Sequence, residues 1–201
     1  MDNSQLSVSW QISEIPPEDH EAIVAFHRDR RTATDIPIMP DYAYANIAHG
    51  LYENTWREHF HQDKNNPYRT GAYKAHIDGK IIGFVRFGTI TFPKKEEFKI
   101  YGLTDWGELL QLYVHPDYHH LGLGWALFRR ATQQLAVWGV RQMLLNVYEK
   151  NYPTRRFYER CGMILSHEKN RRVVRNNITF DVPCAYYILP DVQDYVKNLK
   201  P

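Results

Sequence analysis

The chain has 201 residues, of which 43% are hydrophobic and 24% are charged, and its formal net charge is +2. A chain of this length can bury one sizeable core, so we expect a single domain over residues 1–201. It has no run of about 18 apolar residues, no secretory signal pattern and no Cys-x-x-Cys spacing, so we expect no membrane span and a cytoplasmic protein with reduced thiols.

The first sixty residues predict one strand and two helices. Val8 to Ile12 alternates in polarity as a strand does. Residues 17–31 predict a helix, because acidic side chains stand at its start and arginines at its end, where each complements the helix dipole. A loop that contains Pro37 and Pro40 then leads to a second helix, at about residues 43–60.

A β-hairpin is predicted in the middle of the chain. Two alternating segments, Tyr73–Ile77 and Lys80–Phe87, flank Asp78-Gly79, and this dipeptide is a strong signal for a two-residue turn. A long charged connection follows, at residues 91–106.

Residues 108–138 are the most informative stretch. The apolar run Leu109–Val114 predicts a strand, residues 115–124 form a turn that contains Gly122-Leu123-Gly124, and apolar residues at helical spacing follow as far as Trp138. A strand that reopens into a helix at such a turn leaves backbone N–H groups pointing one way. Together with the positive end of the helix dipole, these groups suit a phosphate. A Gly-x-Gly pair by itself is equally compatible with an ordinary tight turn.

The C-terminal part continues this alternation of strands and helices. The helix ends at Gly139, and Met143–Val147 predicts the next strand, so the two strands should run parallel with a right-handed crossover. A helix is predicted from Pro153 to Gly162. The remaining segments predict a final hairpin, at residues 164–174 and 178–189, and a short terminal helix that starts at Pro190 and Asp191.

Two motifs at a characteristic separation then identify a family. The first is His119-His120-Leu121-Gly122-Leu123-Gly124, preceded by Val114-His115-Pro116-Asp117-Tyr118, and the second is Asn151…Phe157-Tyr158-Glu159 followed by Cys161-Gly162. They resemble the pyrophosphate loop, Gln/Arg-x-x-Gly-x-Gly/Ala, and the later catalytic segment of the GNAT superfamily of acyl-CoA-dependent N-acyltransferases. The resemblance is strong over residues 108–164, and elsewhere only the order of elements agrees.

The resemblance implies an α/β fold with a mixed, mostly antiparallel central sheet that is splayed between strands 4 and 5 and flanked by helices. It also implies an N-acetyltransferase that uses acetyl-CoA as cosubstrate and passes its acetyl group directly to a primary amine. His119 stands where the family usually has Arg or Gln, and Leu121 stands at an often basic position. We therefore expect cofactor affinity, more than ligand identity, to differ from the family pattern.

The expected cofactor contacts also follow from the resemblance. Leu112 to Val114 should offer backbone groups to pantetheine as an added β-strand would, and the turn should hold the pyrophosphate. Asn151 should bond to pantetheine, cap a helix, or do both. The expected cofactor-binding residues are Leu112, Tyr113, Val114, His119, His120, Leu121, Gly122, Leu123, Gly124, Trp125 and Asn151.

Acyl transfer to an amine needs a base and an acid. The amine must lose a proton before it attacks, since a lysine-like ammonium has a pKa of about 10.4 in water, and the departing thiolate benefits from an acid. By resemblance Tyr158 is the acid, with a buried core tyrosine as the alternative. Glu108 is the candidate base, with a solvated strand end as the alternative, and Glu149 or a water chain could also take the proton. Asn146 stands where certain family members have a glutamate base, which argues against that route.

The acceptor is less well defined. In this family the loop between the first two helices usually walls the acceptor site, so Asp35, Met39, Asp41 and Tyr42 are candidate substrate contacts. Residues 1–60 hold ten acidic and four basic side chains, against thirteen and twenty-one in residues 61–201, which suggests an acidic acceptor side and a basic cofactor side. The acceptor can be a small-molecule amine or a peptide amine, and a non-catalytic acetyl-CoA-binding module is a further alternative.

Other ligands are not expected. The closest histidine sets, His59-x-His61 and His119-His120, have no metal-ligand spacing, so we expect no metal. The short cluster Arg171-Arg172…Arg175 is interpreted as the solvent face of a strand, so we expect no nucleic acid. No Gly-x-x-x-x-Gly-Lys-Ser/Thr loop exists, which disfavours a nucleotide switch. A homodimer remains an open alternative.

Overall fold

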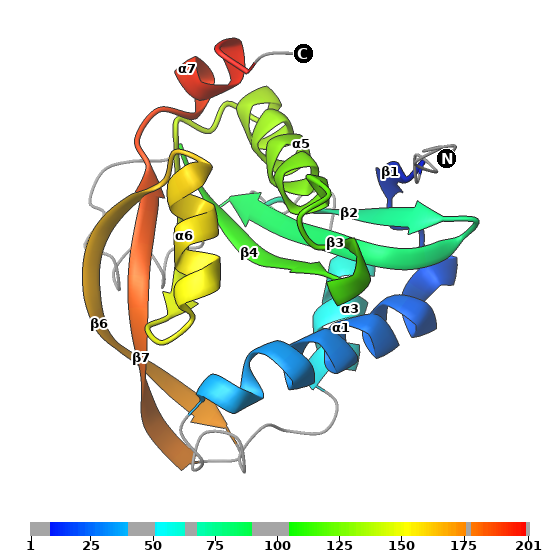
Figure 1. Ribbon diagram of the computed structural model, residues 1–201, viewed down its shortest axis with the longest axis horizontal. Helices are drawn as coiled ribbons and strands as arrows, with labels where there is room; N and C mark the ends of the chain where they lie inside the picture. Colours follow the sequence, from blue (N-terminus) through cyan, green and yellow to red (C-terminus); the bar gives the residue numbers. More distant parts are fainter. Residues whose placement is uncertain (1–8, 40–50, 63–67, 90–104, 176–177, 200–201) are drawn as a thin grey trace, which may run out of the picture.

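The computed structural model describes residues 9–39, 51–62, 68–89, 105–175 and 178–199. In these residues seven strands form one sheet in the order β1-β2-β3-β4-β5-β7-β6 (Figure 1). β4 and β5 pair in parallel, and the other neighbouring strands pair antiparallel. The strands are β1 (Gln11–Glu14), β2 (Thr70–Ile77), β3 (Lys80–Thr89), β4 (Trp106–Val114), β5 (Gln142–Tyr148), β6 (Ile164–Arg175) and β7 (Ile178–Leu189). The mixed, mostly antiparallel sheet that the sequence predicts is therefore confirmed.

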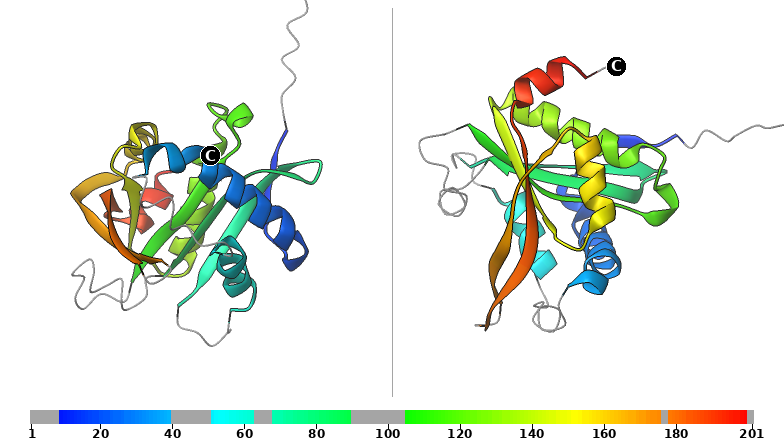
Figure 2. Two further views of the ribbon diagram at one scale, coloured as in Figure 1. Left: turned by 90° about the horizontal axis from the view of Figure 1, so that it is seen from below. Right: turned by 60° about the vertical axis from the view of Figure 1, so that its left-hand side comes forward.

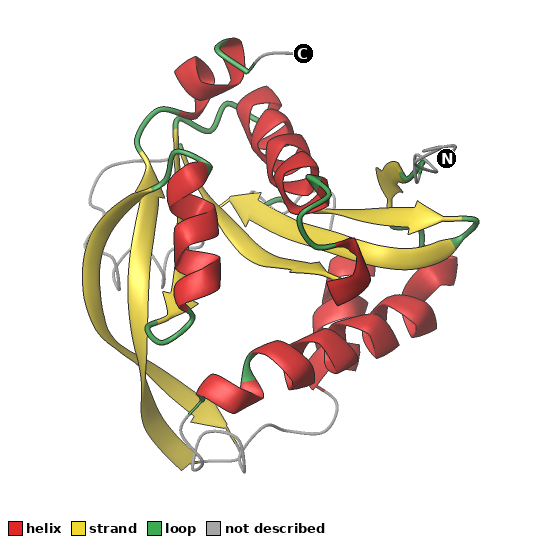
Figure 3. Ribbon diagram, in the orientation of Figure 1, coloured by secondary structure: helices red, strands yellow, loops and turns green. Residues whose placement is uncertain are grey.

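Helices cover both faces of this sheet (Figures 1 and 3). They are α1 (His20–Thr34), α3 (Leu51–Phe60), α5 (Leu123–Val137), α6 (Tyr152–Arg160) and α7 (Val192–Lys197), with short 3₁₀ turns at Pro17–Asp19, Ile36–Ile38 and Pro116–Tyr118. α5 lies on one face of β2 to β4, whereas α1 and α3 lie on the other. Within the described residues, no helix is both long and apolar enough to cross a lipid bilayer.

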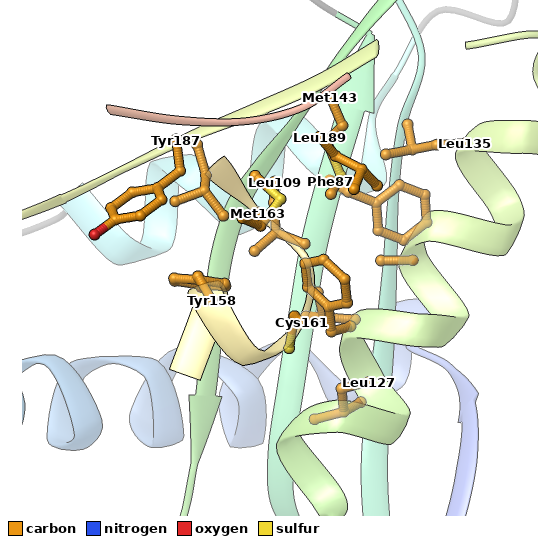
Figure 4. Packing of buried hydrophobic residues seen from close by; sticks show 14 of the residues in the cluster. Phe87, Leu109, Leu127, Leu135, Met143, Tyr158, Cys161, Met163, Tyr187 and Leu189 are labelled. Carbon is orange, nitrogen blue, oxygen red and sulfur yellow. The ribbon is translucent and has the colours of Figure 1, made fainter. Parts of the chain in front are cut away.

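The main core lies between α5, α6 and the sheet (Figure 4). On α5 the residues at helical spacing that the sequence singled out, Leu127, Phe128, Ala131 and Leu135, are fully buried. A second cluster, which includes Ile23 of α1, Trp56 of α3 and Phe84 of β3, fills the space under the opposite face. The amphipathic pattern of each helix thus sets which face it buries.

The predicted hairpins are confirmed. Asp78 and Gly79 both have positive φ, 47° and 80°, which is the geometry of a type I′ turn and the reason for Asp-Gly at this point. β6 and β7 form the long curved hairpin seen at one end of the sheet in Figure 2.

Several predicted boundaries shift. The first strand begins at Gln11 rather than Val8, which lies outside the described residues. α1 continues past Arg31 to Thr34, and Asp35 is its C-cap residue. Of the second predicted helix only α3 falls within the described residues, and most of the predicted charged connection lies outside them. β4 begins at Trp106, so Glu108 is the strand's third residue and does not open it.

The sheet splays where β4 and β5 separate. Their pairing is confined to Trp106↔Gln142, Gly107↔Met143 and Glu108↔Leu144, so beyond Glu108 the edge of β4 is not paired with β5. The register of β4 against β3 also shifts by one residue, because Arg86 pairs with Gln111 while Phe87 pairs with Leu109. Leu110 is therefore the extra residue of a β-bulge, and such bulges re-aim the side chains on either side.

Candidate active site

The turn between β4 and α5 has the geometry that the sequence predicts. Gly122 precedes α5 with φ 79° and ψ −4°, a left-handed conformation that favours glycine, and His120 also has a positive φ of 63°. The first N–H groups of a helix have no intrahelical acceptor, and at the start of α5 no capping side chain accepts from them. A Cβ at Gly124 would come no nearer than 3.4 Å to the Phe157 ring, an ordinary contact, so packing within the protein does not require glycine there.

A cleft of about 390 Å³ begins at this turn and runs along the unpaired part of β4. Of the eleven expected cofactor-binding residues, nine line it, from β4, the turn and the start of α5: Leu112, Tyr113, Val114, His119, His120, Gly122, Leu123, Gly124 and Trp125. Leu121 does not line the cleft, and 53% of its surface is exposed. The local sequence thus forms a left-handed turn at the start of α5 that opens onto a mainly apolar groove, an arrangement that would suit a phosphate-bearing cofactor with an extended arm.

Two of the expected cofactor residues have partners within the protein. The Nε2 atom of His119 lies 3.1 Å from the carbonyl oxygen of Val114, so this nitrogen donates to the last carbonyl of β4. The Oδ1 atom of Asn151 accepts a hydrogen bond from the Thr154 N–H at 3.3 Å, and Asn151 is therefore the N-cap of α6. Asn151 lines the second cavity described below rather than the cleft.

α6 is fixed to the β6–β7 hairpin by a polar network. Arg155 donates to the Tyr187 hydroxyl at 3.2 Å and to Glu168 at 2.6 Å, and Tyr187 donates to Glu159 at 2.8 Å. This network holds the helix that carries Tyr158.

Tyr158 lies on the inner side of α6, 6% exposed (Figure 4). Its ring packs edge-on against Phe157 and tilted against Phe128, at centroid distances of 5.1 and 6.1 Å. Burial raises the pKa of Tyr158 well above its usual range, so the phenol stays protonated at neutral pH. Tyr158 lines both the cleft and a second cavity next to it, and no described residue hydrogen-bonds its hydroxyl.

This second cavity, which we call the acceptor-side cavity, measures about 270 Å³. It lies between the end of α1, β3, β4 and β5 on one side and the β6–β7 hairpin on the other. Its charged, amide and phenol side chains come from α1, β3, β4, β5 and β6, from the segment after α1 and from the N-cap of α6: Arg31, Asp35, Arg86, Glu108, Gln111, Tyr113, Asn146, Tyr148, Asn151 and Arg171.

A buried network closes one wall of the acceptor-side cavity. Asp35, 6% exposed, accepts a hydrogen bond from the Tyr113 hydroxyl at 2.9 Å and lies 3.4 Å from Nε of Arg31. Arg31 also donates from Nη2 to the Tyr148 hydroxyl at 3.3 Å. Burial raises the pKa of Asp35, and the positive charge of Arg31 and the bond from Tyr113 offset part of that rise. Burial likewise raises the pKa of Tyr113, which therefore remains a hydrogen-bond donor.

Glu108 differs from its expected setting. It is 5% exposed, so the alternative of a solvated strand end is wrong. The Leu110 bulge places Glu108, Gln111 and Tyr113 along the same cavity, although their spacing of three and five residues would put Glu108 opposite the other two in a regular strand. Arg86 of β3 is close enough for the charge of Glu108 to act on its pKa.

Of the four expected substrate contacts, two reach the acceptor-side cavity. Asp35 and Met39 line it, whereas Asp41 and Tyr42 lie outside the described residues. Arg171 also lines it, so the interpretation of its cluster as a solvent face is wrong for this residue. Its neighbour Arg172 does face solvent, with 76% of its side chain exposed and Asp181 at 3.7 Å.

Sequence reasoning missed five of these polar residues: Arg31, Arg86, Gln111, Tyr148 and Arg171. Alternation along β3 and β5 could have placed Arg86 and Tyr148 on the side facing α1, but only the strand order brings them together. The cavity has three arginines and two carboxylates, so its lining is not predominantly acidic. Among the described residues, no group of three His, Cys, Asp or Glu side chains is placed to hold a metal ion.

Comparisons with known proteins agree with this geometry. The Acetyltransferase (GNAT) family matches residues 38–163. A Mycobacterium tuberculosis protein described as an uncharacterized N-acetyltransferase is 28% identical over 134 residues, 67% of this chain and 78% of its own. One from Archaeoglobus fulgidus is 30% identical over 120 residues, 60% of this chain and 73% of its own.

Solved structures share the fold. Arabidopsis thaliana NAA60 in complex with acetyl-CoA has a TM-score of 0.65 at 17% identity, over 90% of this chain and 98% of its own. PaiA N-acetyltransferase from Thermoplasma acidophilum in complex with coenzyme A has a TM-score of 0.55 at 21% identity, over 89% and 98%. The residues that match the family include most of those that line the cleft and both predicted motifs. The chain therefore belongs to the GNAT family as an acetyl-CoA-dependent N-acetyltransferase.

Proposed function

We propose that the chain transfers the acetyl group of acetyl-CoA to a primary amine of a small molecule, by direct attack in a ternary complex. The observation that carries the proposal is the position of Tyr158, which lines both the cofactor-type cleft and the polar acceptor-side cavity. A volume of about 270 Å³ suits a compound with few heavy atoms better than an extended peptide.

Each part of the cleft has a role in this proposal. The amides at the start of α5 and the left-handed turn at Gly122 hold the pyrophosphate, and the unpaired edge of β4 between Leu112 and Val114 receives pantetheine as an added strand. Bound acetyl-CoA supplies an activated acetyl thioester, whose C–S bond breaks as the new C–N bond forms. Tyr113 and Tyr158 flank the point where the cleft meets the acceptor-side cavity.

Proton transfer is assigned to two residues. Glu108, as a carboxylate, accepts the proton that the ammonium must lose before it attacks, and the buried wall around it keeps bulk water away. Tyr158, protonated because burial raises its pKa, donates a proton to the sulfur of the leaving group and regains one from solvent. Asp35 is held by Arg31 and Tyr113, so it fits a positioning role in the wall better than the role of a mobile base.

The test is a screen for thiol release from acetyl-CoA with purified protein, using one set of small primary amines and one set of peptides with free N-termini. Cys161 and Cys184 are both buried, and burial raises the pKa of Cys161 to about 12, so the protein's own thiols should contribute little background to a thiol reagent. Release with small amines supports the proposal. Release with peptides alone would assign a peptide acceptor, and tight acetyl-CoA binding without any release would indicate a binding module.

A further inference from the structure

The acceptor-side cavity holds more positive than negative charge. Arg31 and Asp35 neutralise each other, because Arg31 Nε lies 3.4 Å from Asp35 Oδ2 and both belong to the buried network with Tyr113 and Tyr148. What remains in the lining is one carboxylate, that of Glu108, and the two guanidinium groups of Arg86 and Arg171. The lining therefore has one guanidinium group more than it has carboxylates, and Glu58, which does not line the cavity, also acts on Arg86.

Arg86 is the deeper of the two guanidinium groups. Its Nε atom is buried and has no hydrogen-bond partner among the residues that the structure describes. Burial lowers the pKa of Arg86, and the negative charges of Glu58 and Glu108 oppose that effect. A buried donor without an acceptor is costly, and an anionic ligand would provide the missing acceptor.

Arg171 lies on the other side of the cavity, on β6. Its Nη1 atom donates one long hydrogen bond, 3.4 Å, to the side-chain oxygen of Asn146 on β5. Two further basic residues, Lys169 and His167, share its strand face and contact the Tyr186 ring, His167 by stacking at 4.7 Å and Lys169 from 5.6 Å. Lys169 and Arg171 therefore place two positive charges on this face of β6, whereas burial and Lys169 lower the pKa of His167.

We propose that the acceptor is a small primary amine that also carries a carboxylate, such as an amino acid. Arg171 and Arg86 hold its carboxylate, while its amine faces Glu108. The guanidinium fork matches a carboxylate through two parallel hydrogen bonds, and one cavity that contains both signs of charge suits a zwitterion. This inference rests on the proposed function, because it names the acceptor of the same reaction.

Matched pairs of compounds test the proposal. The probes are the L-α-amino acids, β-alanine and 4-aminobutyrate, each paired with the carboxamide that replaces its carboxylate. Binding is measured by calorimetry on protein saturated with CoA, and turnover is measured by thiol release from acetyl-CoA. The variants are Arg171→Gln and Arg86→Gln, and the matched control is Arg172→Gln, which changes the neighbouring exposed arginine. Thermal melts of each variant verify that it folds.

At least one acid should bind about 10- to 100-fold more tightly than its carboxamide, the range expected for charge-assisted hydrogen bonds. Arg171→Gln should remove most of this preference, and Arg172→Gln should keep it. If Arg86→Gln fails to fold, the comparison of the Arg171 and Arg172 variants decides the result. Equal binding of acids and carboxamides, or a preference that survives Arg171→Gln, would overturn the proposal. Thiol release with carboxamides but no preference for acids would leave acetyl transfer intact and overturn only the carboxylate-binding proposal. Tight binding of acids without thiol release would also overturn the proposal, because a compound that is not acetylated is not the acceptor.

Discussion

Tyr158→Phe separates the role of the Tyr158 hydroxyl from that of its ring. The ring is 6% exposed and packs against Phe128 and Phe157, and phenylalanine keeps all of these contacts. No described residue hydrogen-bonds the hydroxyl, so its removal should change the free energy of unfolding by less than about 1 kcal/mol. Acetyl-CoA affinity should stay within a few-fold. Turnover should fall about 10²- to 10⁴-fold, the contribution of a general acid, which corresponds to about 2.7–5.5 kcal/mol in the barrier.

Tyr195→Phe is the matched control. Tyr195 of α7 packs on the same Phe128 ring, also at 6.1 Å, and burial raises its pKa to about 12, yet it lines neither the cleft nor the acceptor-side cavity. The assay is steady-state thiol release with the best amine from the screen, together with calorimetry for acetyl-CoA and a thermal melt. Full turnover in Tyr158→Phe, or an equal loss in Tyr195→Phe, would return Tyr158 to the role of a core residue.

Three further predictions concern the turn, the base and the core. Gly124→Ala should keep or raise the melting temperature, because its Cβ makes only an ordinary 3.4 Å contact within the protein. It should lower the affinity for acetyl-CoA at least ~10-fold, because the cofactor is expected to lie against this residue. Unchanged affinity by calorimetry would contradict the assignment of the turn. Glu108→Gln should lower kcat about 10²-fold at unchanged acetyl-CoA affinity, and wild-type kcat would leave a water chain as the route for the proton. Burial and the nearby Arg31 and Arg86 charges lower the pKa of His27 from 6.5 to about 3. Between these two pH values His27 is protonated in the unfolded chain and neutral in the native protein. The free energy of unfolding should therefore fall as the pH drops below 6.5, by about 3 kcal/mol between pH 7 and pH 4. Urea unfolding of His27→Gln should show a smaller loss over that range, and an identical pH dependence of variant and wild type would refute this account.

The fold class and the geometry of the Gly122 turn could be predicted because their signals are local. The strand, turn and helix that contain Gly122 are contiguous in the chain, and their geometry follows from apolar spacing and one left-handed glycine. The Asp78-Gly79 hairpin is local in the same sense, and it formed as predicted. The end of α1 was predicted less accurately. Asp35, the residue after this helix, is held by contacts with Arg31 and Tyr113 and not by a sequence signal for a helix end.

The acceptor-side cavity was decided only by the tertiary structure. Its charged residues come from α1 and the segment after it, β3, β4 and β6, and their meeting depends on strand order, which no local pattern contains. Two register shifts also matter, one at Leu110 in β4 and one between Leu165 and His167 in β6, since each reverses the strand face on which later side chains lie. Alternation along the sequence therefore assigns Glu108 and Tyr113 to opposite faces of β4, whereas the bulge places them along one cavity.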